Sequence, residues 1–168
     1  MRKIHDLKDL LIEKVRELYD GEKQQIKVLP ALIERIQAED LRAIMVQHVM
    51  DTEDQLLRLE RVFNRLYEEP TSKTNMVMKS LLKEAKDLQT RSADQQEVLD
   101  AGLISSMQHI KHYEIAGYGA VANYANLLDE EVIASLLHES LEEEKSADER
   151  LRDLAETRIN LSAKSVYQ

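Results

Sequence analysis

Four carboxylates interrupt apolar stripes that otherwise repeat at helical spacing: Glu22, Asp51, Glu114 and Glu144. Each falls near the middle of its helical segment rather than at an end, where water would solvate it. If the segments pack as an antiparallel bundle, the acids reach about the same height in its interior. A charged carboxylate in a low-dielectric core is costly unless it is compensated. Protons, a lysine or arginine partner, or metal ions could each compensate this set, whereas a single such acid is usually a boundary residue.

Metal chemistry is one interpretation of this pattern. Carboxylate-bridged iron or manganese in a bundle core is a recurrent arrangement, with one acid from each helix and further ligands one turn away. His48 lies one turn before Asp51, and Asp148 shares a helix face with Glu144. Either could ligate a metal or support a ligand by hydrogen bonding, although His48 could equally be a buried histidine bonded to a backbone or acidic group. The chain has no cysteine, which excludes thiolate sites and c-type haem attachment.

Four long segments with helical periodicity must position these side chains, and a shorter one lies between the second and third. In chain order the five segments span roughly residues 6–37, 40–68, 74–88, 93–128 and 130–160. Abundant Leu, Glu, Ala, Lys and Arg, with only four glycines and two prolines, favour an all-α protein with short connections. The very short turn at Asp129 makes the last two helices antiparallel neighbours. We expect one domain covering residues 1–168.

Residues that weaken helices fall inside these segments. Pro30 removes a backbone hydrogen bond within the first helix, which predicts a kink or break there. All four glycines lie within predicted helices, where each costs about 1 kcal/mol relative to alanine. Close packing between helices, or a local bulge, would offset that cost. We expect aliphatic residues of the shorter helix to cover the bundle or a second subunit, among them Met76, Met78, Leu81 and Leu82.

Charge and hydropathy exclude several classes of partner. The formal charge of −9 argues against nucleic acid, because no compact basic stripe offsets it. The N-terminal stretch MRKIHDLKDL lacks the continuous apolar region of a signal peptide. No apolar run approaches the roughly 20 residues that cross a bilayer. We therefore expect a cytoplasmic protein that binds neither nucleic acid nor membranes.

Four blocks carry a family resemblance: YDGEKQ (19–24), HVMDTEDQ (48–55), KHYEIAGYG (111–119) and LEEEKSADERL (141–151). Their order and spacing resemble the YciE/YciF family of bacterial stress-associated ferritin-like proteins, over most of the chain. The resemblance implies a rubrerythrin-like, antiparallel four-helix bundle with an extra short helix in the crossover between the second and third long helices. It also implies homodimers and a di-iron site. The acids that match the family's motifs are Glu22, Glu114 and Glu144.

Two positions depart from the family's pattern. On the second helix the usual His-Leu-Glu-Glu-Thr is His-Val-Met-Asp-Thr here, so Asp51 keeps a carboxylate but is shorter by one methylene. On the third long helix the usual acid-His-Tyr-Glu begins with Lys111, one turn from Glu114. Lys111 could swing outward, or it could place its ammonium among the acids and take the role of a metal. The resemblance therefore implies a degenerate site that is mononuclear, weakly loaded or empty.

Two functional hypotheses remain open. In the first, the protein binds iron or manganese at Glu22, Asp51, Glu114 and Glu144, supported by His48 and Asp148, and handles oxygen or peroxide. A nearby tyrosine (Tyr19, Tyr113 or Tyr118) would hydrogen-bond near the centre. In the second, the protein is a non-catalytic stress scaffold or interaction protein whose core acids are neutralised by Lys111. Neither hypothesis identifies a small-molecule substrate.

Overall fold

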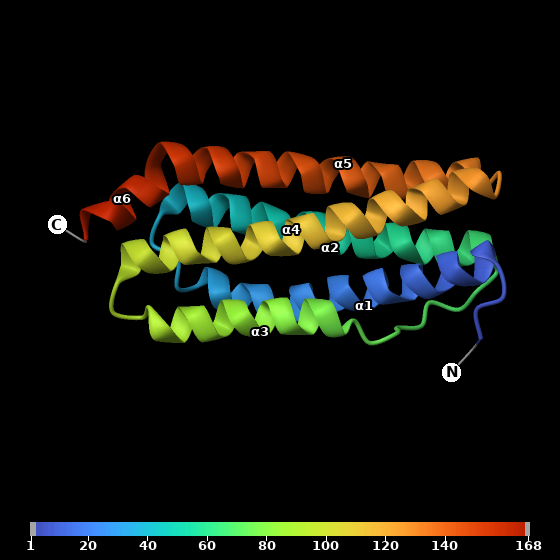
Figure 1. The fold of residues 1–168 in the computed structure, drawn as a ribbon, viewed down its shortest axis with the longest axis horizontal. Coiled ribbons are helices and arrows are strands. Elements are labelled where there is room, and N and C mark those ends of the chain that lie inside the picture. Colours follow the sequence, from blue (N-terminus) through green and yellow to red (C-terminus); the bar gives the residue numbers. More distant parts are fainter. Residues whose placement is uncertain (1–2, 167–168) are drawn as a thin grey trace.

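The chain forms a bundle of four long antiparallel helices with a shorter helix along one side (Figure 1). The computed structural model describes residues 3–166. Its helical segments are α1 (Leu7–Ile33), α2 (Glu39–Leu66), α3 (Met76–Arg91), α4 (Gln96–Leu127), α5 (Glu131–Leu154), the π-helical turn η1 (Ala155–Ile159) and α6 (Asn160–Ser165). Residues 3–166 contain no strand. The expected all-α, ferritin-like four-helix bundle with an extra helix in the crossover is confirmed.

The four long helices pack in a ring in which each contacts two neighbours. The contacting pairs are α1 with α2, α2 with α5, α5 with α4, and α4 with α1. Neighbours run in opposite directions, and the short turn after α4 makes α4 and α5 a helical hairpin (Figure 1). The crossover from α2 carries α3 to the outside of the bundle, where it packs on α1 and α4.

The ends of two helices differ from those predicted. α1 begins after Asp6, whose side chain accepts a hydrogen bond from the Asp9 backbone N–H at 2.8 Å. It continues through Pro30 and ends at Ile33 rather than near residue 37. Beyond Glu34 the backbone bonds change to the tighter i→i−3 type, from Arg35 N–H to the Leu32 carbonyl and from Ile36 N–H to the Ile33 carbonyl. The last predicted helix divides into α5, η1 and α6, and the π-helical turn is a feature that apolar periodicity does not reveal.

The core consists of two apolar clusters with a polar layer between them. One cluster lies near the α4–α5 turn and includes Leu11, Phe63 and Val121. The other lies toward the opposite end of the bundle and is covered by Met78, Leu82 and Ala85 of α3. Each long helix contributes to both the apolar clusters and the polar layer. None of the helices in the described part of the chain is long and apolar enough to cross a membrane.

One face of the short helix α3 packs on the bundle, and the opposite face is exposed to solvent. Of the aliphatic residues expected to cover the bundle, Met78 and Leu82 are buried, Leu81 is partly buried, and Met76 is 62% exposed. α3 also approaches α4 closely at Gly102, where an added Cβ would lie 2.5 Å from Leu88 Cδ2. The glycine there is explained by close helix packing, as the sequence indicated.

The crossover is anchored by one buried asparagine. The Asn75 side chain accepts a hydrogen bond from the Met78 N–H at 2.9 Å and so caps α3. It also donates to the Glu17 carbonyl of α1 and accepts from the Tyr113 hydroxyl of α4, each at 3.0 Å. A single side chain therefore ties the start of α3 to two helices of the bundle.

Candidate functional site

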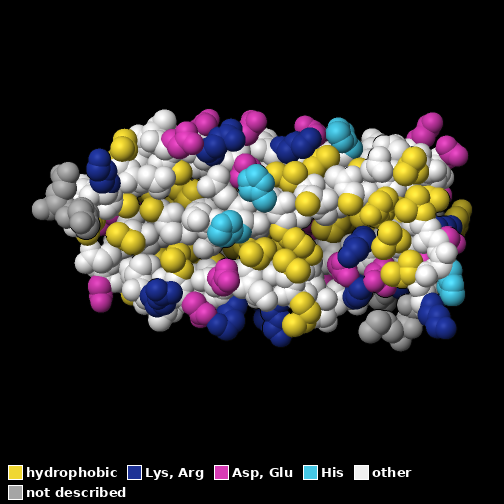
Figure 2. Space-filling view, in the orientation of Figure 1, with side chains coloured by type: hydrophobic (Ala, Val, Ile, Leu, Met, Phe, Trp, Pro, Cys, Tyr) yellow, Lys and Arg dark blue, Asp and Glu magenta, His cyan; other side chains and the backbone are white. Residues whose placement is uncertain are grey.

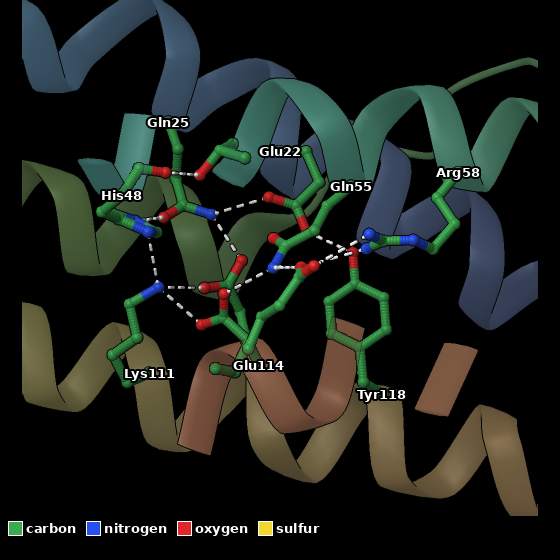
Figure 3. Close-up of polar contacts among 11 residues, drawn as sticks. Glu22, Gln25, His48, Gln55, Arg58, Lys111, Glu114 and Tyr118 are labelled. Atoms are coloured by element: carbon green, nitrogen blue, oxygen red, sulfur yellow. Dashed lines mark hydrogen bonds and ion pairs between the residues drawn. The ribbon is translucent and has the colours of Figure 1, made fainter. Parts of the chain in front are cut away.

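Side chains from all four long helices meet in the polar layer (Figure 3). We call these residues the central cluster: Glu22 and Gln25 of α1, His48 and Gln55 of α2, Lys111, Glu114 and Tyr118 of α4, and Glu144 of α5. All of them are at most 2% exposed. Three of the four acids singled out in the sequence are therefore brought together inside the bundle.

Lys111 extends into the cluster rather than outward. Its Nζ lies 2.6 Å from Glu144 Oε2, 2.7 Å from His48 Nδ1 and 3.5 Å from Glu114 Oε2 (Figure 3). The side chain is 0% exposed, so water does not screen these interactions. The ammonium occupies the point on which the carboxyl groups of Glu144 and Glu114 and an imidazole nitrogen of His48 converge.

The ion pair between Lys111 and Glu144 sets the charge of the cluster. Burial by itself would raise the pKa of Glu144, but the Lys111 charge lowers that pKa to about 2. Burial would likewise lower the pKa of Lys111, yet the charges of Glu144 and Glu114 raise it above its ordinary value. Both groups are consequently ionised at neutral pH.

The other two carboxyls hold protons at neutral pH. Burial, reinforced by the charge of Glu144, raises the pKa of Glu22 to about 8. Burial, followed by the charges of Glu144 and Glu22, raises the pKa of Glu114 well above its ordinary value. With one ammonium, one carboxylate and two protonated carboxyls, the cluster is close to electrically neutral. That is the condition for a polar layer to persist in a low-dielectric core.

His48 is neutral and its orientation is set by Gln25. The Gln25 amide nitrogen donates to Glu22 Oε2 at 3.2 Å and to Glu114 Oε1, which leaves its oxygen to accept from His48 Nε2 at 3.0 Å. The network assigns the imidazole proton to Nε2 and leaves Nδ1 to accept from Lys111. Burial and the Lys111 charge lower the pKa of His48 to about 3. A neutral imidazole is thus an acceptor for the ammonium.

Gln55 connects the central cluster to the outer side of the α2–α5 interface. Its amide nitrogen donates to Glu144 Oε1 at 2.9 Å and to Glu143 Oε2 at 3.0 Å. Glu143 in turn pairs with Arg58, at 2.8 Å from its Nη2. Arg58 also donates to Ser140 Oγ at 2.8 Å. These contacts connect the buried carboxylate of Glu144, through Gln55, to the partly exposed ion pair of Glu143 with Arg58.

Among the three tyrosines considered from the sequence, Tyr118 is the one in the cluster. Its hydroxyl donates to Glu22 Oε1, and burial raises its pKa well above the ordinary value. Tyr19 instead donates to Glu60 at 3.0 Å, and Tyr113 donates to Asn75. Tyr118 follows Glu114 by one helical turn, and this spacing was the signal that could have identified it.

Asp51 does not join the other acids. It is partly exposed and accepts a hydrogen bond from Gln47 of its own helix at 2.8 Å. Thr52, 0% exposed, occupies the inward position and donates to the His48 carbonyl at 2.8 Å. The rotation of α2 buries positions 48, 52 and 55, which places Asp51 about 100° from Thr52 at the edge of the α2–α5 interface. The expectation of a mid-bundle carboxylate at this position is wrong.

Asp148 is buried but separate from the central cluster. Its carboxylate accepts from Gln108 at 3.3 Å and lies 3.5 Å from Nε2 of His112, which is 68% exposed at its side chain. Asp148 of α5 therefore links α5 to α4 at their interface, just beneath the surface. We expected Glu144 and Asp148 to share a ligand or a hydrogen-bond partner, but their contacts are with different residues.

The side chains as arranged do not fit a metal ion. Residues 3–166 contain no group of three or more His, Asp or Glu side chains placed to hold one. The potential ligands that converge most closely, from Glu144, Glu114 and His48, are directed at Lys111 Nζ. Gln25 and Gln55 lie beside these acids, and their amide nitrogens donate to Glu22, Glu114 and Glu144 rather than offering oxygens to a cation. The donor set fits a lysine counter-charge.

Comparison with known proteins identifies the family. The chain matches the DUF892 family, a domain of unknown function, over residues 6–164. It is 34% identical to the protein YciF of Escherichia coli K12 over 160 residues, which are 95% of this chain and 96% of YciF.

Solved structures agree with this relationship. The crystal structure of the E. coli stress protein YciF superposes with a TM-score of 0.88 at 33% identity, covering 94% of this chain and 99% of that one. YcfI of Rhodopseudomonas palustris, described as a candidate structural protein, has a TM-score of 0.87 at 34% identity, covering 90% and 96%. A Xanthomonas campestris protein shares the fold, with a TM-score of 0.78 at 21% identity, covering 97% and 99%. The chain therefore belongs to the DUF892 family, as a YciF-type ferritin-like bundle protein.

Proposed function

We propose that this protein is a non-catalytic, stress-associated bundle protein in which Lys111 takes the place of metal in a degenerate di-metal site. The observation that carries the proposal is the position of Lys111 Nζ, 2.6 Å from Glu144 and 3.5 Å from Glu114 in a fully buried site. The stress association rests on the relative described as a stress protein. The protein then acts as a scaffold or through its surface, with the cluster as a structural element.

The charge balance of the cluster supports this proposal. Lys111 supplies one positive charge, Glu144 one negative charge, and the raised pKa values keep Glu22 and Glu114 protonated. A divalent cation among the same acids would face the ammonium at close range, and like charges repel strongly in a low-dielectric interior. Metal uptake would therefore require Lys111 to leave and the carboxyls to lose their protons.

Iron or manganese binding is the competing hypothesis, and one observation favours it. Glu114 Oε2 and Gln55 Oε1 are buried atoms without a hydrogen-bond partner. Buried polar atoms are normally satisfied, so these two unpartnered oxygens are compatible with a group that binds after rearrangement and release of the Glu114 proton. Lys111 would have to turn aside for either oxygen to reach a cation.

Metal analysis distinguishes the two hypotheses. We expect protein purified from cells supplemented with iron and manganese to contain well below one equivalent of either metal. Lys111→Glu should raise that content, because it restores the acid that the family usually carries at this position. Lys83→Glu is the matched control, since Lys83 is an exposed lysine of α3 and its change should leave metal content unaltered. Stoichiometric metal in the wild type that disappears in Glu144→Ala would overturn the proposal.

A further inference from the structure

The outer side of α2 exposes a row of apolar side chains. Val46, Met50 and Leu57 are 46%, 54% and 58% exposed. Their spacing of four and seven residues places them on one face of the helix, over a length of about 17 Å. The buried positions of α2, such as Thr52 and Gln55, face the interior instead, so packing within the monomer does not account for this row. A row of exposed apolar side chains, unlike single scattered ones, is typical of a surface that a partner covers.

Acidic side chains border this apolar row on both sides. Glu53 and Asp54 lie between Met50 and Leu57 along the helix, and at about 100° per residue each is displaced to a different side of the row. Both acids are exposed, and neither is paired with a cation within residues 3–166. Apolar side chains flanked by free carboxylates are complementary to a surface that offers apolar side chains flanked by positive charges.

A groove between α2 and α5 lies beside the apolar row. It has a volume of about 520 Å³, and four of the residues that line it are acids: Asp51 of α2 and Glu139, Glu142 and Glu143 of α5. Acidic side chains are also frequent at the upper edge of Figure 2, over α5, whereas the middle of that view, over α4, carries few charges. Negative charge is therefore concentrated beside α5 and the groove rather than spread evenly over the bundle.

Carboxylates outnumber cations on this surface. The carboxylates are those of Asp51, Glu53, Asp54, Glu139, Glu142 and Glu143. Arg58 lies 3.0 Å from Glu139 and 2.8 Å from Glu143, and the other cations beside these acids are Lys145 and Arg150. Six carboxylates and three cations leave the surface with a net charge of −3. It can therefore accept further positive charge from a partner.

We propose that the outer side of α2 and the adjoining α2–α5 groove bind a cationic, amphipathic helix of another protein. We call this surface the α2 docking face: Val46, Met50, Asp51, Glu53, Asp54 and Leu57, with the acids of α5 that line the groove. Two helices side by side leave a groove in which a third helix can lie with its apolar face inward. Apolar side chains of the partner cover the row on α2, and its lysines or arginines meet the carboxylates on either side.

The charge of the docking face argues against other occupants. Nucleic acid and anionic lipid carry negative charge and would be repelled by the unpaired carboxylates of Glu53 and Asp54. A second copy of this chain, which has a net charge of −9, would bring like-charged acids together. A basic helix is favoured because it both covers the apolar row and neutralises its borders.

The docking face gives the proposed non-catalytic role a surface through which to act, and it lies outside the central cluster. Metal content and partner binding are therefore separate measurements. Stoichiometric metal in the wild type would overturn the proposed function and leave the docking face untouched. Absence of partner binding would overturn the docking face and leave the role of Lys111 as counter-charge unaffected.

Fluorescence anisotropy of a labelled synthetic peptide tests the proposal. The peptide is a helix of about 15 residues of leucine, lysine and alanine, with leucines on one face and lysines along both of its edges. We expect it to bind the wild-type protein, and its affinity to fall by about tenfold or more in Leu57→Ser and in Asp54→Lys. The matched controls are Val77→Ser and Glu84→Lys on the exposed side of α3, which should each change the affinity by less than about twofold at physiological salt.

A second peptide separates docking from general charge attraction. It has the same composition, but its leucines are distributed around the helix, and we expect it to bind more weakly. The proposal would be overturned by a wild type that binds neither peptide, by equal affinity for the two peptides, or by equal affinity of Leu57→Ser and Val77→Ser for the first. Self-association of the wild type that is lost in Leu57→Ser, measured by sedimentation velocity, would also overturn it, because a second copy would then be the occupant. Thermal denaturation would verify that each variant is folded.

Discussion

Replacing Lys111 with methionine removes the ammonium from the central cluster while keeping a long flexible stem. Glu144 then loses the charge that lowers its pKa from the ordinary 4.5 to about 2. At about 1.4 kcal/mol per pKa unit, the net shift of Glu144 corresponds to roughly 3 kcal/mol of the free energy of unfolding at pH 7, and Lys111 is its largest favourable contributor. Breaking a buried ion pair by removing one partner costs about 3–5 kcal/mol in other proteins, which agrees with this magnitude. For a chain of this size, where 1 kcal/mol shifts the Tm by about 2–4 °C, the expected fall in Tm is about 6–12 °C.

The measurement is urea or thermal denaturation of metal-free protein between pH 3 and pH 8. The stabilisation from Glu144 is present above its unfolded pKa and is lost as the pH falls toward its folded pKa of about 2. The difference between wild type and Lys111→Met should therefore shrink as the solution is acidified. Lys83→Met, which removes an exposed lysine from an i,i+4 pair with Asp87, is the control and should leave the unfolding midpoint nearly unchanged.

A second substitution separates the lost ion pair from other effects of the methionine. Glu144→Gln in the Lys111→Met background removes the carboxylate that was left uncompensated, so much of the lost stability should return. An unchanged Tm for Lys111→Met would show that Lys111 is not the counter-charge of the cluster. Strictly additive losses in the double variant would refute the coupling between the two side chains.

Three further outcomes are expected. The native state holds a proton on Glu22 up to about pH 8, whereas the unfolded chain releases it near pH 4.5. The contribution of Glu22 to stability should therefore fall as the pH rises from about 4.5 to 8. Glu22→Gln should flatten this dependence of the denaturant midpoint on pH. Tyr118→Phe leaves Glu22 Oε1 without its donor and should cost about 1–3 kcal/mol in the same assay. Gly102→Ala forces Leu88 to move and should lower the Tm, whereas Gly119→Ala, whose added Cβ meets no atom closer than 4.0 Å, should leave the Tm equal or higher. The opposite order would contradict the packing described.

Helical periodicity accounts for most of the fold. Apolar residues spaced three and four apart identified all the long helices and the short one, and the acids at Glu22, Glu114 and Glu144 marked the polar layer correctly. Helix ends were less accessible to this reasoning. α1 stops at Ile33, where the backbone bonds tighten into a turn, and η1 interrupts the last helix at a place where the side-chain pattern does not change.

Position along a helix face is known from sequence only to within about one residue, and this uncertainty explains the error at Asp51. Asp51 and Thr52 both lie near the boundary of the α2 stripe, about 100° apart. Packing against α1 and α5 turned Thr52 inward and left Asp51 bonded to Gln47. Local spacing contains no information that decides between two such neighbours, because the choice depends on the partners of the helix.

The sequence by itself determined that acids would share the middle of a helical bundle with a lysine one turn from Glu114. Only the tertiary structure decided that Lys111 points inward, that Gln25 orients His48, and which carboxyl carries the charge. The physical reason is that these properties depend on distances between groups on different helices. Burial and the spacing from Lys111 to Glu144 set the pKa values, and neither quantity exists until the helices are packed.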